Sequence, residues 1–346
     1  MRCGIARWAL VLPAVLGAWP AGAVSLVAEL TGARPFTSLA LMAELELWED
    51  RTFLSGCFAS TRSAPLELTG TGDAIDIPRS NQLCLGLDHG LDNHFRLSAS
   101  ASLAPRAITR VDLLSSPLLV FRSENASAGV TLGASYDSAG LEEVQWGVDV
   151  GLSLTGYDLS HEWITALRTR RFPAVLGTAR PSAGVIWAFG DTQLQLRASY
   201  TFYSKDPLVV GAVSDQELLA LDEILRRLIQ ASQIYGLNEQ YAAFLGAANR
   251  LMAADAVSGL ASAPVWFEVR PSVQHRFAGW LRGQLGYSFD RYVPTQGYAH
   301  LLSTRWTVIF SDHVRTWVAA AAQLDVPGSM RPKLQGILTF GVEVTF

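Results

Sequence analysis

The chain has 346 residues, with 27 lysines and arginines against 31 aspartates and glutamates, which gives a formal net charge of −4. This acidic balance argues against a nucleic-acid partner, because proteins that bind nucleic acids carry a basic excess. The mean hydropathy is positive, at +0.22, yet no apolar run of about 18 residues follows the N-terminal segment, which argues against an ordinary transmembrane helix. The apolar residues must therefore be dispersed along the chain.

Residues 1–23 have the features of a secretory signal peptide. Arg2 and Arg7 precede an apolar stretch that is too short to span a bilayer, and the segment ends in the small residues Ala-Gly-Ala. Cys3 lies in the charged part, so a lipoprotein attachment site is not expected. The alternative is a membrane anchor that stays uncleaved. Cleavage after Ala23 would leave residues 24–346 with 25 basic and 31 acidic residues, a net charge of −6.

The N-terminal third contains five candidate β-strands in which apolar residues alternate irregularly with polar ones. They are residues 38–48, 51–60, 82–89, 95–104 and 108–121. This assignment leaves a long connection, with the sequence TRSAPLELTGTGDAIDIPRS, between the second and third candidates.

Nine clearer candidate strands follow between Ala128 and Phe346. In residues 144–155, for example, one face is Val, Trp, Val, Val, Leu and Leu, and the other is Gln, Gly, Asp, Gly, Ser and Thr. These strands reach about ten residues, which a tilted strand needs to cross a membrane. Their apolar faces carry aromatic residues toward the ends, and their polar faces are rich in Gly, Ser, Thr, Gln, Asp and Arg. This combination favours a membrane barrel over a soluble sandwich.

The segment 213–260 breaks the period-two pattern and predicts an inserted α-helical hairpin. Leu218, Leu221, Leu225 and Leu228 follow helical spacing, and Ser214 begins a capping box. Two interpretations stay open: the apolar stripes bury each other as a cap over a barrel mouth, or the hairpin is a gate, a plug or a docking surface.

The connections between the nine strands alternate in length. Short ones follow Asp137, Phe189, Phe277 and Phe310, whereas long ones follow Asp158, Lys205, Asp290 and Asp325. The last strand places Leu338 and four further apolar residues on one face. These four are Phe340, Val342, Val344 and Phe346.

The alternating strands, the alternating connections and the terminal Phe346 together resemble a bacterial outer-membrane β-barrel. The resemblance implies an all-β, transmembrane, antiparallel up-and-down barrel of about 14 strands, with 12 as the alternative, in the outer membrane of a Gram-negative bacterium. It also implies that outer-membrane lipid surrounds the chain and that the barrel assembly machinery recognises Phe340, Val342, Val344 and Phe346. The long loops would lie outside the cell. The resemblance is architectural, because no motif of a substrate-specific family is present.

Cys57 and Cys84 are the two cysteines that remain after signal cleavage, and in an oxidising compartment they are expected to pair. In the 14-strand assignment they lie near a strand end and the next strand start. A disulfide between them would then lie close to the periplasmic rim and close the long connection.

Arginines dominate the face that the alternation directs toward the lumen. The predicted lumen-facing residues are Asp149, Arg197, Glu268, Arg270, Arg282, Arg305, Arg315 and Glu343, together with Arg276 and Asp290. One interpretation is a network of arginines and carboxylates that fills a narrow barrel. The other is a water-filled pore whose excess of arginine favours anions. A barrel of 12 to 14 strands is compatible with both.

Residues with catalytic potential are sparse. Asp88, His89, Asp92 and His94 form one group and Asp158, Ser160, His161 and Glu162 another, but loop formation explains such groups more simply than a metal site or a triad does. We therefore expect no metal, no cofactor and no enzymatic activity. A channel or transporter for small anionic solutes is the favoured function. The alternatives are a structural barrel that docks an envelope protein and, less favoured, an enzyme acting on lipids or peptides.

Overall fold

The computed structural model describes residues 24–33, 36–48, 51–63, 66–68, 73–76, 80–112, 119–138, 144–165, 169–205, 207, 264–293, 297–327 and 333–346. The predicted signal peptide, residues 1–23, and the predicted helical hairpin, residues 213–260, lie outside this part of the chain. No helix among the described residues is long and apolar enough to cross a membrane.

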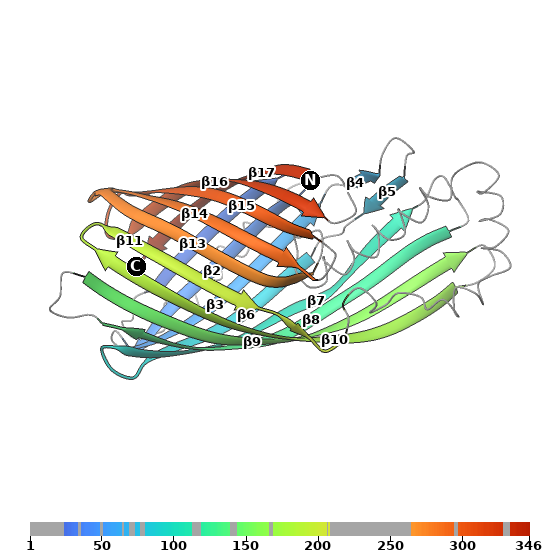
Figure 1. The fold of residues 1–346 in the computed structure, drawn as a ribbon, viewed down its shortest axis with the longest axis horizontal. Coiled ribbons are helices and arrows are strands. Elements are labelled where there is room, and N and C mark those ends of the chain that lie inside the picture. Colours follow the sequence, from blue (N-terminus) through green and yellow to red (C-terminus); the bar gives the residue numbers. More distant parts are fainter. Residues whose placement is uncertain are drawn as a thin grey trace.

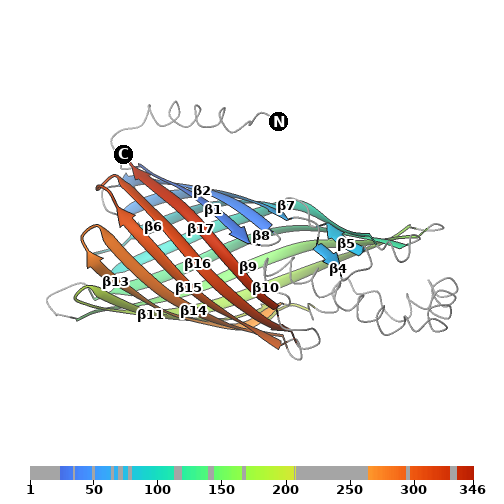
Figure 2. The ribbon, with the colours of Figure 1, turned by 90° about the horizontal axis from the view of Figure 1, so that it is seen from above.

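The described residues form one closed antiparallel β-barrel of 14 strands, as the sequence predicts (Figures 1 and 2). The chain closes on itself because β1 pairs with both β2 and β17, from Ser25 opposite Thr345 to Ala33 opposite Ile337. The strands of the wall are β1 (Val24–Ala33), β2 (Phe36–Trp48), β3 (Thr52–Ser63), β6 (Ser80–Gly90), β7 (Phe95–Asp112), β8 (Leu119–Asp137), β9 (Val144–Thr165), β10 (Thr169–Phe189), β11 (Thr192–Tyr200), β13 (Val265–Ala278), β14 (Leu281–Tyr292), β15 (Gly297–Ile309), β16 (Val314–Pro327) and β17 (Lys333–Thr345). A two-residue strand, β12 (Phe202–Tyr203), continues β11, and β4 (Leu66–Leu68) pairs with β5 (Asp73–Asp76).

The sequence prediction missed one strand and added another that does not exist, so the two errors cancel in the total of 14 strands. Residues 24–33 form β1, which the sequence analysis did not assign as a strand. Residues 108–121 do not form a separate strand: Ile108–Asp112 belong to the end of β7 and Leu119–Phe121 to the start of β8. The apolar residues Ile108 and Val111 on one side and Leu119–Phe121 on the other imitate one strand, although they belong to two neighbouring antiparallel strands.

The missed strand β1 reverses the direction that was assigned to β2 and β3. The connection from Ser63 to Ser80, predicted to be periplasmic, therefore lies at the same end as the other long connections. Figure 1 shows its short strands β4 and β5 beside the far end of β7, with which β5 pairs. All turns at the opposite end, such as Gly190–Asp191 and Gly279–Trp280, are short. We call these two ends the long-connection end and the short-turn end.

Strands β7 to β10 are 18, 19, 22 and 21 residues long and extend beyond the rest of the wall (Figure 1). The pairing of β9 with β10 runs without interruption from Val144 opposite Phe189 to Ile164 opposite Thr169. The segment from Asp158 to Ala179, predicted to be a long loop, is therefore mostly strand. Its apolar alternation disappears because this part of the wall no longer faces lipid.

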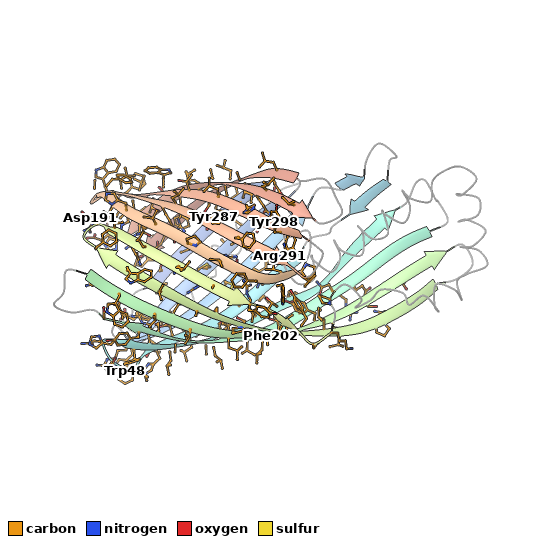
Figure 3. All side chains as sticks on the ribbon, viewed as in Figure 1. Trp48, Asp191, Phe202, Tyr287, Arg291 and Tyr298 are labelled. Atoms are coloured by element: carbon orange, nitrogen blue, oxygen red, sulfur yellow. A yellow bond between two sulfur atoms is a disulfide. The ribbon has the colours of Figure 1, made fainter. Side chains whose placement is uncertain are left out.

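The outer surface is apolar and has two aromatic belts. Its exposed apolar side chains include Leu85, Leu132, Val150, Leu302 and Leu338, which range from 54% to 60% exposure. Near the short-turn end Tyr136 lies 5.3 Å from Trp146 and Phe277 lies 5.6 Å from Trp306, measured between ring centroids. Toward the other end Tyr200 lies 4.6 Å from Phe202. Figure 3 shows Trp48 in the first region and Phe202 and Tyr298 in the second. This surface suits a bilayer.

Charged residues replace apolar ones on the outer face of β9 beyond Leu154. Asp158 is exposed and lies 3.7 Å from the Arg106 guanidinium, which also contacts Glu124 at 3.3 Å. Arg171 on β10 donates to Glu124 at 3.0 Å. An ion-pair cluster of this kind belongs in water, so the projecting parts of β7 to β10 lie outside the hydrocarbon region.

The lumen lacks a continuous apolar core within the described residues. The buried apolar side chains there are few, namely Tyr157, Leu176, Tyr292, Val293, Ala299 and Trp317. The wall formed by β6 to β9 is thin, because glycines alternate with hydroxyl residues of the neighbouring strands. A Cβ atom at Gly86 would come within 2.5 Å of Ser55 Oγ, and one at Gly133 within 2.5 Å of Ser98 Oγ. Among the described residues, the side chains on this part of the wall are too small to fill the lumen.

A disulfide joins Cys57 of β3 to Cys84 of β6. The two residues are direct cross-strand neighbours in the middle of the paired strands, and Cys84 lies on the face opposite Leu83 and Leu85, toward the lumen. The predicted location at the periplasmic rim was therefore wrong. The cause is the length of the two strands: β3 continues to Ser63 and β6 begins at Ser80, beyond the predicted 51–60 and 82–89, so the cysteines lie in mid-strand.

The disulfide should stabilise the barrel by restricting the unfolded chain. For a sequence separation of 27 residues, the chain-entropy model gives about 3 to 4 kcal/mol. We expect the free energy of unfolding of the variant with Cys57→Ser and Cys84→Ser, measured by urea titration, to be lower by that amount. Denatured but unreduced wild-type protein should show no labelled thiol. Two labelled thiols in the unreduced wild type would contradict the bond.

Candidate functional site

The structure places all the predicted lumen-facing residues on one continuous face of the wall from β9 to β17. The strand register explains this arrangement. Asp149 lies opposite Gly184, Gly184 opposite Arg197, and Arg197 opposite Arg270, so one row crosses four strands. Farther around the wall Gln284 lies opposite Arg305, and Arg315 opposite Glu343.

The first group of these residues forms ion pairs, and we call it the paired tier: Asp149, Arg180, Arg197, Glu268 and Arg270. Glu268 is buried and binds the guanidinium groups of both Arg180 and Arg270. Ser199 Oγ accepts a hydrogen bond from Arg180 Nε at 2.9 Å and donates one to Glu268 at 3.1 Å. This carboxylate therefore holds two arginines from different strands.

The second ion pair of the paired tier depends on a glycine. Arg197 donates to Asp149 Oδ2 at 2.7 Å although β10 lies between their strands. A Cβ atom at Gly184, on β10, would come within 2.2 Å of Asp149 Oδ1. The carboxylate thus crosses β10 through the space that a side chain at position 184 would occupy.

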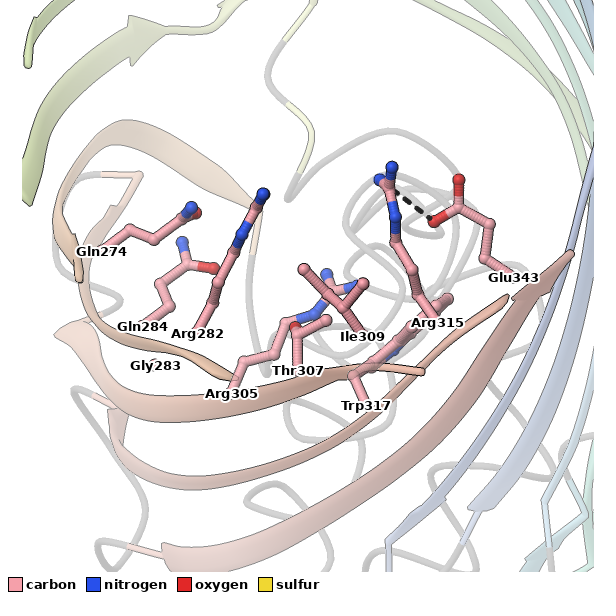
Figure 4. A pocket seen from close by; sticks show the side chains of 10 residues that line it. All are labelled: Gln274, Arg282, Gly283, Gln284, Arg305, Thr307, Ile309, Arg315, Trp317 and Glu343. Atoms are coloured by element: carbon pink, nitrogen blue, oxygen red, sulfur yellow. Dashed lines mark ion pairs between the residues drawn. The ribbon is translucent and has the colours of Figure 1, made fainter. Parts of the chain in front are cut away.

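The second group lies near the short-turn end and surrounds a pocket of about 230 Å³. We call it the arginine pocket. It is lined by Arg282, Arg305, Arg315, Gln274, Gln284 and Glu343 (Figure 4). The guanidinium of Arg315 lies 3.9 Å from Glu343, which is a loose ion pair. Within the described part of the chain, Arg282 and Arg305 form no ion pair, and their Nε atoms are buried without a hydrogen-bond partner.

Trp317 supports Arg305 in the arginine pocket. The Arg305 Cζ atom lies 4.4 Å from the centroid of the Trp317 ring, which is a cation–π contact. The other side of the indole lies against Gly341 of β17, because a Cβ atom there would come within 2.1 Å of ring atoms Cε2 and Cζ2. Trp317 is 4% exposed. The three residues form a stack from the wall toward the lumen.

Sequence reasoning missed several residues of these two groups. Arg180 was assigned to the edge of a supposed loop, and Gly184 and Gly341 carry no signal beyond their place on the lumen face. Trp317 follows Arg315 by two residues, so the alternation directs it to the lumen face as well. There it is a large aromatic residue among polar ones. That exception to the alternation of residue types was the available clue.

The predicted alternatives with metal or catalytic chemistry do not assemble into a site. Asp92 Oδ1 accepts hydrogen bonds from the amides of His94 and Phe95, both at 2.7 Å, and these bonds hold the pKa of Asp92 below its usual range. Asp92 thus shapes a turn. In the other group Ser160 Oγ accepts from Arg171 Nε at 2.6 Å. In the described ranges, no three His, Cys, Asp or Glu side chains gather where they could hold a metal ion.

The predicted assembly residues lie on the outer, apolar face of the closing strand. Phe340 is 53% exposed and lies opposite Leu30 of β1, while Val342 and Val344 lie opposite Ala28 and Leu26. The backbone amide of Phe346 donates to the Val24 carbonyl at 2.9 Å.

Comparisons with known proteins identify the fold. No protein-family model matches the chain, and no curated protein matches it in sequence. Among solved structures, the toluene transporter TbuX of Ralstonia pickettii has a TM-score of 0.50 and 8% identity over 96% of this chain and 92% of its own. CymD, a monoaromatic hydrocarbon channel, has a TM-score of 0.49 and 10% identity over 97% and 92%. The toluene transporter TodX of Pseudomonas putida has a TM-score of 0.45 and 9% identity over 99% and 93%. The chain therefore has the fold of outer-membrane β-barrel proteins.

Proposed function

We propose that the barrel is a water-filled channel or transporter for small anionic solutes in the outer membrane of a Gram-negative bacterium. The protein would reach this membrane after removal of its signal peptide. The observation that carries the proposal is the state of Arg282 and Arg305, which line the lumen pocket and form no salt bridge with a carboxylate among the described residues. A permanently charged group that lacks an internal counter-ion attracts anions from the solution.

The accessibility of the lumen supports a passage over a packed interior. The side chains of Arg197 and Arg270 are 50% and 60% exposed even though both are paired. A lumen filled by its own side chains would bury such groups, as in the smallest barrels. The paired tier fits the interpretation as a structural network. The arginines of the arginine pocket are instead available to bind solutes.

A planar-bilayer measurement tests the proposal. We expect purified mature protein, inserted in a bilayer between unequal KCl solutions, to give discrete current steps with a reversal potential on the chloride side. A reversal potential on the potassium side, or no current above that of a detergent control, would contradict a channel for anions.

A second function is favoured by the projecting parts of β7 to β10. Their outer face carries the ion-pair cluster of Arg106, Glu124, Asp158 and Arg171 above the apolar belt. Such a rigid polar extension suits contact with an envelope protein. A silent bilayer measurement would favour this anchoring role, with the barrel as its membrane base and no enzymatic step.

A further inference from the structure

We propose that the arginine pocket is a binding site for the oxyanion group of a small organic solute, and that Trp317 and Gly341 position Arg305 for it. The inference rests on the proposed channel function and adds the place and the chemistry of recognition. The pocket would be a solute-binding site along the permeation pathway, and not only a region of positive potential.

The charge of the pocket is unbalanced. Arg282, Arg305 and Arg315 contribute three positive charges, whereas Glu343 contributes one negative charge at a loose 3.9 Å from Arg315. Glu29 of β1 also acts on Arg305 through its charge, but forms no salt bridge with it among the described residues, so the positive charge is still in excess. In the paired tier, by contrast, the Arg197 guanidinium binds Asp149 at 2.7 Å and Glu268 is shared by two arginines. An anion that enters the lumen therefore finds its unneutralised partners at the short-turn end.

The geometry of the free donors suits an oxyanion. The Nε atoms of Arg282 and Arg305 are buried and lack a hydrogen-bond partner. A guanidinium presents its N–H groups as a planar fork that matches two oxygens of one carboxylate or phosphate group. A halide ion can accept from both arms only at a single centre, so its hydrogen bonds are bent, whereas two oxygens let both bonds be straight. The shared chemistry of the ligand is thus a carboxylate or a phosphate.

The lining of the pocket, whose volume is about 230 Å³, also bears on the chemistry of the solute. Gln274, Gln284 and Thr307 line it beside the arginines and offer neutral donors and acceptors. These groups suit hydroxyl or carbonyl substituents, so a small, hydrophilic organic anion fits better than an apolar one.

The stack of Gly341, Trp317 and Arg305 argues for a built site. The buried indole fills the space above Gly341, and its free face carries the Arg305 guanidinium at 4.4 Å. An arginine in an otherwise hydrated lumen would sample many rotamers, whereas stacking on a fixed ring restricts it before a ligand arrives. Trp317 and Gly341 are thus positioning residues.

The first experiment measures inhibition of the chloride current of the full mature protein by two probes, succinate and glycerol 3-phosphate, with succinamide as the neutral control. We expect at least one charged probe to lower the current at concentrations where succinamide does not, and the probe with the lower midpoint identifies the preferred group. In the variant with Arg282→Gln and Arg305→Gln the midpoint should rise at least about tenfold, because two charged hydrogen-bonding groups are lost. An unchanged midpoint would overturn the site.

The second experiment separates positioning from charge. Gly341→Ala leaves every charge in place but displaces Trp317, so we expect the midpoint to rise about fivefold while the reversal potential in KCl stays on the chloride side. Trp317→Leu serves the same purpose if the alanine variant does not insert. Arg291→Gln removes a charge from the outer face, where Arg291 lies opposite Tyr298 (Figure 3), and should change nothing. Equal inhibition in wild type and both positioning variants would overturn the role of the stack.

Failure of the channel and failure of the site give different results. A wild-type protein without current overturns the proposed function, and calorimetric titration of the two probes in detergent then decides the site directly: heat that disappears in the double variant supports it, and no heat overturns it. An anion-preferring current that neither probe inhibits overturns the site alone.

Discussion

Replacement of Arg305 by Glu should move the reversal potential strongly toward cation preference while the barrel stays folded. The substitution changes the local charge by two units, and a unit charge acting over about 4 Å in water is worth about 1 kcal/mol, or roughly a fivefold change in ion preference. Two units therefore change the permeability ratio by an order of magnitude or more. Stability should fall by about 1 kcal/mol for the lost cation–π contact. A loss of similar size is expected from the charges of Glu29 and Glu343, which act on Arg305 without a salt bridge among the described residues.

The graded variant Arg305→Gln provides the control. It changes one charge unit and should give about half of the shift in reversal potential, with the same small loss of stability. A packed lumen predicts the opposite result, a loss of several kcal/mol and no current in any variant. That outcome, measured by urea unfolding together with bilayer recording, would remove the pore from consideration.

Replacement of Glu268 by Gln should destabilise the barrel more than the neutralisation of any other lumen-facing carboxylate that the structure describes. The buried carboxylate binds Arg180 and Arg270 and accepts from Ser199, so its neutralisation leaves two guanidinium groups facing each other. Breaking a buried ion pair costs about 3 to 5 kcal/mol, and because both arginines are partly exposed we expect about 2 to 3 kcal/mol. The midpoint of urea unfolding in detergent or lipid measures this loss.

Glu343→Gln is the matched control for Glu268→Gln. It makes the same chemical change on the same lumen face, but Glu343 lies 3.9 Å from Arg315 and is more exposed than Glu268. We expect a change in unfolding free energy below about 1 kcal/mol, as for exposed ion pairs in general. Equal losses in the two variants would mean that the paired tier does not hold the wall in the way described.

The face of each residue was largely predictable from the sequence. In a strand the side chains alternate strictly between the two faces, so a period-two pattern assigns Arg197, Glu268 and Arg305 to the lumen without any knowledge of their partners. The requirement that lipid meet an apolar surface makes this pattern strong wherever the wall crosses the membrane. The pattern weakens in β9 after Gly156 and in the facing part of β10, before Gly177, and the strand assignment failed there.

The direction of the first strands was not predictable from the same pattern. β1 is an amphipathic strand that directly follows a predicted cleavage site, and its pairing with β17 joins the two ends of the chain. A missed strand reverses the sense of every strand before the next compensating error. The cysteines were expected correctly to pair. Their place in the middle of β3 and β6, however, follows from the strand bounds and the register, which the pattern did not give.

The division of the arginines into paired and unpaired ones was decided by tertiary structure alone. The sequence left two outcomes open for Arg197, Arg270 and Arg305, namely a clamp on a carboxylate or a free charge, and both occur in one lumen. Which of them applies depends on cross-strand register, on whether a glycine such as Gly184 lets a carboxylate cross a strand, and on whether a ring such as Trp317 occupies the space instead. These are distances between residues far apart in the chain, and a local alternation pattern carries no information about them.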